Sequence, residues 1–183
     1  MNESQQLVFL AGFMGSGKST IGPLLAREIH FGFIDADSFI EEKENISIRD
    51  IFKTRGEKYF RSLEENVLKE IVLEKGNNVV ALGGGALASE LNRILVKKSG
   101  ILVYLKSDAA NILERVRARS NRPMLLSTDG QPLTEDELSV RVASLLRERE
   151  KYYLEASIVV DTSKLSISES VKEIVLKLRD KII

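Results

Sequence analysis

The stretch that decides the fold is Leu7-Val-Phe-Leu-Ala11, followed at once by Gly12-Phe-Met-Gly-Ser-Gly-Lys-Ser19. The five apolar residues are typical of a short buried strand. Behind the glycines, apolar residues recur with helical spacing from Ile21 to Ile29. The segment therefore predicts a strand, a glycine-rich turn and a helix, which is the context of a phosphate-binding loop.

The turn matches the full G-x-x-x-x-G-K-[ST] pattern, and its residue types suit an anionic phosphate. Glycine adopts backbone angles that residues with a Cβ resist, so successive N–H groups can face inward. The helix that begins near Lys18 adds its positive N-terminal end. We expect Lys18 to reach the β- and γ-phosphates and the Ser19 hydroxyl to ligate Mg²⁺. The predicted ATP-binding residues of this turn are Gly12, Gly15, Ser16, Gly17, Lys18, Ser19 and Thr20.

Four more short apolar runs follow along the chain and alternate with longer segments of helical spacing. They are Phe33–Ile34, Val79–Leu82, Ile101–Leu105 and Ile158–Val160. Strands that alternate with helices predict a parallel sheet covered on both faces. We therefore expect an α/β fold with five strands, in one domain that spans residues 1–183.

The composition argues against several classes of protein. Hydrophobic residues make up 43% and charged residues 30%, which favours a folded chain over a disordered one. Lys plus Arg equals Asp plus Glu at 27 each, so the charge predicts no nucleic-acid or membrane partner. With no cysteine and one histidine, disulfides and thiolate or histidine metal clusters are excluded. We find no signal peptide and no apolar run of membrane-spanning length, so we expect a cytoplasmic protein.

Two carboxylates, Asp35 and Asp37, follow the second apolar run, about one crossover helix after the phosphate-binding loop. Open α/β sheets bind their ligands at this end of the strands. If the strand continues through Asp37, both side chains point the same way. One would then support the water shell of Mg²⁺, and the other would accept a hydrogen bond from an alcohol about to be phosphorylated. The alternative is a solvated turn in which Asp37 caps the next helix.

Two further features suggest a site for the phosphoryl acceptor. Arg61 lies three residues before Glu64 in a segment of helical spacing, so the two side chains can share a face. Most such pairs are surface ion pairs of little energetic value. The triplet Gly83-Gly84-Gly85 follows an apolar run, where it weakens the strand end without a packing gain. Such a triplet suits a backbone that must approach a ligand closely.

The segment from Arg119 to Glu135 interrupts the alternation of strands and helices. It holds two of the three prolines and an Asp-Gly turn signal, without sustained periodicity. A loop of this length in a small domain is usually functional, so we expect a mobile lid at about 119–135. Arg122 in this lid would close over the phosphates and stabilise transition-state charge. Thr134 and Glu137 predict a capping box that opens the next helix.

Taken together, these elements resemble the shikimate kinase family, from Leu7 to about Thr162 and in the expected order. The phosphate-binding loop alone occurs in many NTPases, whereas the whole set is specific. The resemblance implies a three-layer P-loop kinase fold, with a parallel sheet in strand order 2-3-1-4-5 and a mobile lid. The late Asn-Lys-x-Asp motif of GTPases does not occur, which favours adenine as the base. The matching elements are the phosphate-binding loop, Asp35-Ala-Asp37, Phe60-Arg61 with Glu64, Gly83-Gly84-Gly85 and Arg122-Pro123.

The resemblance implies a role for each matching residue of the acceptor site. Shikimate would be held within a region at about 35–64 and by the glycine triplet, Gly83, Gly84 and Gly85. Arg61 would grip the shikimate carboxylate, because a planar guanidinium pairs with a carboxylate through two hydrogen bonds. Asp37 would bind the ring hydroxyls.

For the nucleotide and metal, the resemblance implies a second set of residues. Asp35 would support Mg²⁺ through water, Arg115 would stack near the adenine, and Arg122 would be the lid arginine. The expected catalytic residues are Lys18, Asp37 and Arg122, with Asp37 as the candidate base.

The family has a second carboxylate-clamp arginine, which we assign to Arg149, with Arg147 as a competitor. The family usually places a proline two residues after this arginine, a tyrosine four after it, and an alanine four beyond the tyrosine. In this chain Lys151 replaces the proline, Tyr153 keeps its spacing and Ala156 arrives one residue early.

The expected reaction is transfer of the ATP γ-phosphoryl group to the 3-hydroxyl of shikimate, a step of the chorismate and aromatic amino acid pathway. The products would be shikimate 3-phosphate and ADP. One alternative is another small-metabolite kinase, such as a gluconate kinase or a nucleoside monophosphate kinase. The other is a catalytically silent relative that binds nucleotide as a regulatory module. Balanced charge and the lack of an obvious apolar stripe favour a monomer.

Overall fold

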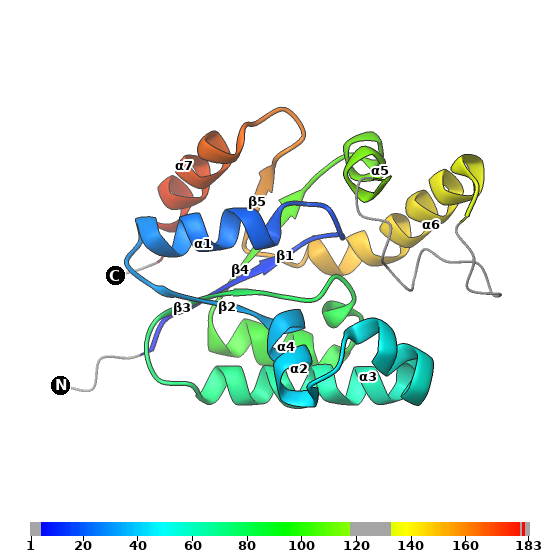
Figure 1. Cartoon of the computed structure of the whole chain (residues 1–183). Coiled ribbons are helices and arrows are strands. Elements are labelled where there is room, and N and C mark those ends of the chain that lie inside the picture. The colour runs from blue at the N-terminus through cyan, green and yellow to red at the C-terminus, as the bar shows by residue number, and fades with distance from the viewer. Residues whose placement is uncertain (1–4, 118–132, 180, 182–183) are drawn as a thin grey trace.

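The computed structural model describes residues 5–117, 133–179 and 181. These residues form a parallel sheet of five strands between two layers of helices (Figure 1). The strand order is β2-β3-β1-β4-β5, so the predicted α/β fold and the implied order 2-3-1-4-5 are confirmed. The strands are β1 (Leu7–Ala11), β2 (Gly32–Asp35), β3 (Asn78–Ala81), β4 (Ile101–Lys106) and β5 (Ile158–Asp161).

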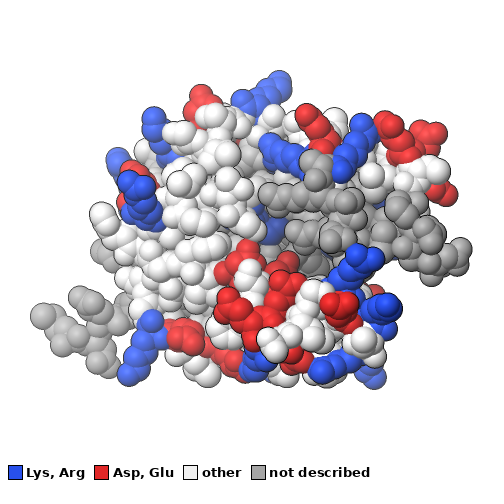
Figure 2. Space-filling view, in the orientation of Figure 1, with Lys and Arg blue, Asp and Glu red and all other residues white. Residues whose placement is uncertain are grey.

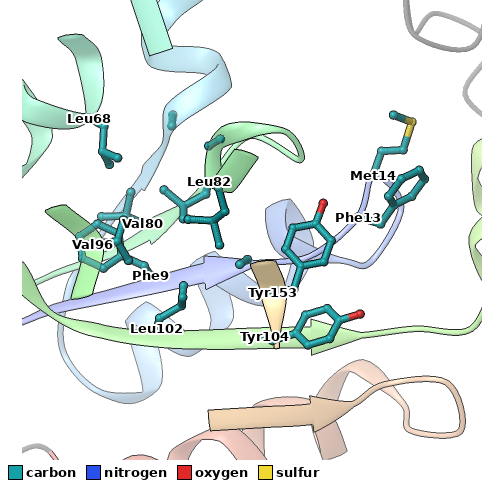
Figure 3. Packing of buried hydrophobic residues seen from close by; sticks show 14 of the residues in the cluster. Phe9, Phe13, Met14, Leu68, Val80, Leu82, Val96, Leu102, Tyr104 and Tyr153 are labelled. Atoms are coloured by element: carbon teal, nitrogen blue, oxygen red, sulfur yellow. The ribbon is translucent and has the colours of Figure 1, made fainter. Parts of the chain in front are cut away.

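Strand β1 is the centre of the sheet and is buried along its whole length. Successive side chains of a strand point to opposite faces. Accordingly, Leu7, Phe9 and Ala11 join one apolar cluster, while Val8 and Leu10 join the other. Figure 3 shows the first cluster, with Phe9 among buried residues of the neighbouring strands. The apolar run that opens the chain is therefore the part of the sheet that both cores share.

The helices cover both faces of the sheet (Figure 1). Those on one face are α1 (Lys18–Glu28) and α7 (Ile167–Leu178). Those on the other face are α2 (Ala36–Glu44), α3 (Ile48–Leu73) and α4 (Glu90–Ser99), and a 3₁₀ turn, η1 (Ala86–Ala88), follows β3. The remaining helices, α5 (Ala109–Arg117) and α6 (Glu135–Tyr153), pack against each other.

Helix α3 is interrupted at Gly56, whose backbone angles are φ 81° and ψ 172°. This left-handed φ is unfavourable for other residue types, so glycine is the residue expected at the break. The half after the break contains Arg61 and Glu64, which the sequence placed in a segment of helical spacing, and its apolar residues Phe60, Val67 and Ile71 are buried. Residues before and after the break line the acceptor cavity described below.

Most of the predicted lid, with Arg119 and Arg122, lies outside the described residues. After this segment, Thr134 caps α6 and forms the predicted capping box with Glu137. Within the described part of the chain, no helix is both long enough and apolar enough to cross a membrane.

Candidate active site

The glycine-rich turn between β1 and α1 has the geometry of a phosphate cradle. Gly15 and Gly17 have φ angles of 81° and 100°, which few other residues tolerate. Lys18 folds back over the turn, and its Nζ donates hydrogen bonds to Gly12 O at 2.7 Å and Phe13 O at 3.1 Å. No described side chain caps the N-terminus of α1, so its positive end faces the cradle.

A cavity of about 320 Å³ lies over this turn, and its lining includes every residue of the turn that was predicted to bind ATP except Gly12. Arg115 reaches it from α5, and its Nη1 donates to Gly15 O at 3.1 Å. The opposite wall comes from the segment after β5, which the sequence did not assign to the site. Its position at the carboxyl end of a parallel strand was the available signal. The residues of this wall are Thr162, Leu165, Ile167 and Ser170.

Ser19 and Asp35 are joined at the edge of this cavity. The Ser19 hydroxyl donates a hydrogen bond of 2.9 Å to Asp35 Oδ2. Two hard oxygen ligands beside a phosphate cradle fit Mg²⁺, which prefers oxygen and retains several waters. Among the described residues there is no cluster of three acidic, histidine or cysteine side chains that could hold a metal alone. A magnesium ion here would therefore need phosphate oxygens and water to complete its shell.

Asp35 and Asp37 do not lie on one continuous strand. Strand β2 ends at Asp35, because the Asp35 side chain accepts hydrogen bonds from the N–H groups of Asp37 at 3.1 Å and Ser38 at 3.3 Å. Asp35 is thus the N-cap of α2 and Asp37 is in its first turn. The strand does not continue through Asp37, so the condition for two side chains that point the same way is not met. The alternative of a helix cap applies, but the capping residue is Asp35 and not Asp37. Both residues nevertheless line both cavities.

A second cavity, of about 440 Å³, is the candidate acceptor site. It brings together Asp37, Arg61, Glu64, Gly83, Gly84, Gly85 and Arg149 from four separate parts of the chain. Figure 2 shows acidic side chains gathered in the region of α2, beside the hollow at the centre of this face. The wall formed by the α2–α3 junction lies within the predicted region at about 35–64, although none of its residues was singled out from the sequence. It consists of Ser38, Glu41, Ser47, Ile48, Arg49 and Phe52.

Arg61 and Glu64 form an ion pair in which Glu64 is buried and Arg61 is half-buried. Arg61 Nη1 lies 2.9 Å from Glu64 Oε2, and Glu64 is 5% exposed. The other Glu64 oxygen, Oε1, has no hydrogen-bond partner among the described residues. Burial raises the pKa of the Glu64 carboxyl above its usual value, although the charge of Arg61 opposes this shift. The site therefore holds an acceptor oxygen beside a positive guanidinium.

The glycine triplet allows charged side chains to approach the backbone. A Cβ at Gly83 would lie 2.7 Å from Glu64 Oε1 and 2.8 Å from Asp37 Oδ1. A Cβ at Gly85 would lie 2.5 Å from Arg61 Nη1. These distances are shorter than van der Waals contact, so a larger residue would displace the charged groups.

The structure distinguishes the two arginines considered for the carboxylate clamp. Arg149 is 7% exposed, lines the acceptor cavity and donates from Nη1 to Gly84 O at 3.3 Å. Arg147 is exposed and does not line that cavity. The geometry thus favours Arg149. The predicted lid arginine, Arg122, lies outside the described residues.

The two cavities adjoin, because Met14, Ser19, Asp35, Asp37 and Gly84 line both. A phosphate in the glycine-rich cradle and a hydroxyl beside Asp37 would therefore be neighbours. Such an arrangement suits direct transfer of a phosphoryl group, which depends mainly on positioning and charge neutralisation.

The family model of shikimate kinase matches residues 14–179. The chain belongs to the shikimate kinase family. A shikimate kinase of Chloroherpeton thalassium is 44% identical over 168 residues, which cover 92% of this chain and 89% of the relative. One of Chlorobaculum tepidum is 44% identical over 172 residues, covering 94% and 90%.

Solved structures agree with this assignment to the shikimate kinase family. A shikimate kinase from Acinetobacter baumannii in complex with shikimate matches with a TM-score of 0.87 and 33% identity, over 99% of this chain and 97% of the other. One from Aquifex aeolicus matches with a TM-score of 0.81 and 34% identity, over 97% and 99%. The chain is accordingly an enzyme, an ATP-dependent kinase that acts on shikimate in the aromatic amino acid pathway.

Proposed function

We propose that this kinase binds shikimate in the 440 Å³ cavity and ATP with Mg²⁺ in the 320 Å³ cavity, and phosphorylates the 3-hydroxyl of shikimate. The observation that supports this most strongly is the placement of Asp37 where the two cavities adjoin, with Arg61 and Arg149 in the wall of the first. The acceptor would thus be a small acid with a hydroxyl directed at the phosphate cradle.

The acceptor would be oriented by charge and hydrogen bonding. Arg61 and Arg149 would bind the carboxylate, since guanidinium groups pair with carboxylates through parallel hydrogen bonds. Asp37 would accept a hydrogen bond from the reacting hydroxyl and take its proton as the bond to phosphorus forms. Gly83, Gly84 and Gly85 would let the acceptor lie against the backbone.

The nucleotide would be oriented by the turn between β1 and α1. The backbone N–H groups of Gly15 and Gly17 and the ammonium of Lys18 would neutralise the phosphates as charge shifts during transfer. Ser19 and Asp35 would hold Mg²⁺, Asp35 through water, and the ion would supply charge neutralisation between the β- and γ-phosphates. Arg115 would stack near the adenine, and the role of Arg122 in a lid rests on the sequence resemblance.

Arg61 and the glycine triplet in the acceptor cavity favour a small polyhydroxy acid over a nucleotide. A gluconate kinase would also need a carboxylate site, so the assay below is what separates it from a shikimate kinase. A silent module would have no need for Lys18, Ser19, Asp35 and Asp37 together. We also propose a cytoplasmic monomer without nucleic-acid or membrane partners, because acidic and basic residues are balanced at 27 each.

The test is ADP release with ATP and Mg²⁺, with shikimate, gluconate, AMP or no acceptor added. We expect shikimate alone to stimulate ADP release strongly. Stimulation by gluconate or AMP instead would overturn the assignment of the acceptor cavity and keep that of the nucleotide cavity. Nucleotide binding without turnover under any condition would support the silent module.

A further inference from the structure

Two side chains of α6 donate hydrogen bonds to one carbonyl oxygen of the glycine triplet. Arg149 Nη1 lies 3.3 Å from Gly84 O, and the Tyr153 hydroxyl also donates to Gly84 O. The two donors are four residues apart, so they project from the same side of the helix. Because a carbonyl oxygen has two lone pairs, both hydrogen bonds can exist at once.

The Tyr153 side chain belongs to the core and meets the site through its hydroxyl. The residue is 2% exposed, and its ring centroid lies 5.2 Å from that of Tyr104. Figure 3 shows the two rings side by side. Burial raises the pKa of the Tyr153 hydroxyl above its usual value, so the group stays protonated at neutral pH and acts as a donor. A ring fixed by packing holds such a donor in one place.

Gly84 differs from its two neighbours in what holds its carbonyl oxygen. Gly83 O and Gly85 O accept backbone N–H groups of the following turn, each at 3.0 Å. Gly84 O instead accepts from the side chains of Arg149 and Tyr153. Glycine rotates its peptide group easily, because it has no Cβ. The orientation of the Gly84 carbonyl therefore depends on α6.

Gly84 is also the residue of the triplet that touches both substrate cavities. A Cβ there would lie 3.4 Å from Met14 N in the phosphate-binding turn and 3.9 Å from Arg149 Nη1. Rotation of its peptide group would consequently disturb the contact with Arg149 at the acceptor side.

We propose that the Tyr153 hydroxyl is a positioning group for the acceptor site, an inference that rests on the proposed binding of an acidic acceptor by Arg149. By holding Gly84 O, Tyr153 fixes the glycine triplet and leaves most of the Arg149 donors for the carboxylate. A guanidinium has five N–H donors, and the contact with Gly84 O uses one of them. Without the Tyr153 hydroxyl, Arg149 would be the one side chain of this pair left to donate a hydrogen bond to Gly84 O. Tyr153 itself lines neither of the two substrate cavities.

The test is the steady-state kinetics of Tyr153→Phe, which removes the hydroxyl and keeps the packed ring. We expect the KM for shikimate to rise about tenfold, the size of effect that follows the loss of one buried hydrogen bond. The KM for ATP and kcat should stay within about twofold of the wild type. Because KM does not depend on the concentration of active enzyme, a partly folded preparation still gives the result.

The matched control is Tyr104→Phe, which removes the hydroxyl of the neighbouring ring. That hydroxyl donates to Glu150 Oε1 at 3.3 Å and not to the triplet. We expect its KM values to equal those of the wild type. The inference is wrong if Tyr153→Phe keeps the wild-type KM for shikimate, if both KM values rise together, or if Tyr104→Phe has the same effect.

A double-mutant cycle tests whether Tyr153 acts through Arg149. In the Arg149→Lys background, Tyr153→Phe should raise the KM for shikimate by less than about twofold, because the clamp is already lost. A full tenfold rise in that background would contradict the proposed route. If shikimate does not stimulate ADP release by the wild-type enzyme, the proposed function itself is wrong. That outcome is distinct from a failure of the Tyr153→Phe test or of the double-mutant cycle.

Discussion

The Arg61 guanidinium holds the Glu64 carboxylate through a hydrogen bond of 2.9 Å, and Glu64 is 5% exposed, while its second oxygen has no partner in the part of the chain that the structure describes. In this pair, burial and the charge of Arg61 have opposite effects on the pKa of Glu64. Burial disfavours the charged form of Glu64, whereas the positive charge of Arg61 favours it. Burial is the larger effect, so the pKa of Glu64 is raised above its usual value of 4.5.

This raised pKa predicts how the stability of a Glu64→Gln variant depends on pH. An acid whose pKa is higher in the folded state stabilises the protein below its unfolded pKa, and this contribution is lost as pH rises through the folded pKa. The free energy of unfolding of the wild type minus that of Glu64→Gln should therefore be highest near pH 4.5 and fall toward neutral pH. Thermal unfolding of both proteins between about pH 4.5 and 8 measures this. If this free-energy difference rises with pH instead, the charge of Arg61 has a larger effect on the pKa of Glu64 than burial has.

A second prediction concerns the space at Gly83. In Gly83→Ala the new Cβ would lie 2.7 Å from Glu64 Oε1 and 2.8 Å from Asp37 Oδ1, so both carboxylates must move. We expect kcat/KM for shikimate to fall about tenfold or more, the effect of roughly 1–3 kcal/mol of overpacking. The KM for ATP should change little. Steady-state kinetics with each substrate varied in turn measure both values.

Gly76→Ala is the control for this change. Gly76 has a φ of 98° with no atom within 4 Å of the added Cβ, so the substitution strains the backbone without reaching the cavities. It should lower stability by roughly 1 kcal/mol and leave both KM values unchanged. Equal kinetic effects at Gly83 and Gly76 would refute the steric explanation.

Lys18→Ala should reduce kcat by about a hundred- to a thousandfold, the range for loss of one preorganised group at the reacting charge. The reason is that the Lys18 ammonium sits over the phosphate cradle, 2.7 Å from Gly12 O. The control is Lys43→Ala, because Lys43 pairs with Glu70 on the surface and should leave kcat unchanged. Single-turnover ADP formation compares the three enzymes. A kcat for Lys18→Ala within tenfold of the wild type would exclude the proposed role.

Asp35→Asn should raise the Mg²⁺ concentration needed for half-maximal rate by about ten- to a hundredfold, as expected for loss of an outer-shell ligand. Asparagine caps helices nearly as well as aspartate, so α2 should keep its stability. The control is Asp108→Asn, because Asp108 Oδ1 accepts from the Asn111 N–H at 2.8 Å at the start of α5, away from both cavities. An unchanged magnesium dependence in Asp35→Asn would remove Asp35 from the metal site.

The phosphate-binding loop could be predicted because its signal is local, whereas the strand order was implied by the family resemblance. Residues 7–19 contain a buried strand, the glycine turn and Lys18 in one uninterrupted segment. The alternation of strands and helices then restricts the sheet to a few arrangements. Arg149 was assigned from the family resemblance with Arg147 as a competitor, and burial now separates the two.

The parts of the site that sequence did not predict depend on contacts between distant segments. The sequence left open whether the strand continues through Asp37 or a helix begins there; the Asp35 carboxylate decides this, because it accepts two backbone N–H groups and starts α2. Ile48 and Phe52 lie in the acceptor wall because α2 and α3 pack on each other, and Leu165 reaches the nucleotide cavity from beyond β5. Their residue types are ordinary for a core, so no local pattern marks them.

The most direct test of the central claim is phosphorus and proton NMR of the product formed from shikimate, ATP and Mg²⁺ by the wild-type enzyme. We predict one phosphate monoester, coupled to the proton on carbon 3 of the ring and formed in a one-to-one ratio with ADP. ADP without phosphorylated shikimate, or a phosphate on a different hydroxyl, would contradict the proposed arrangement of the two cavities around Asp37.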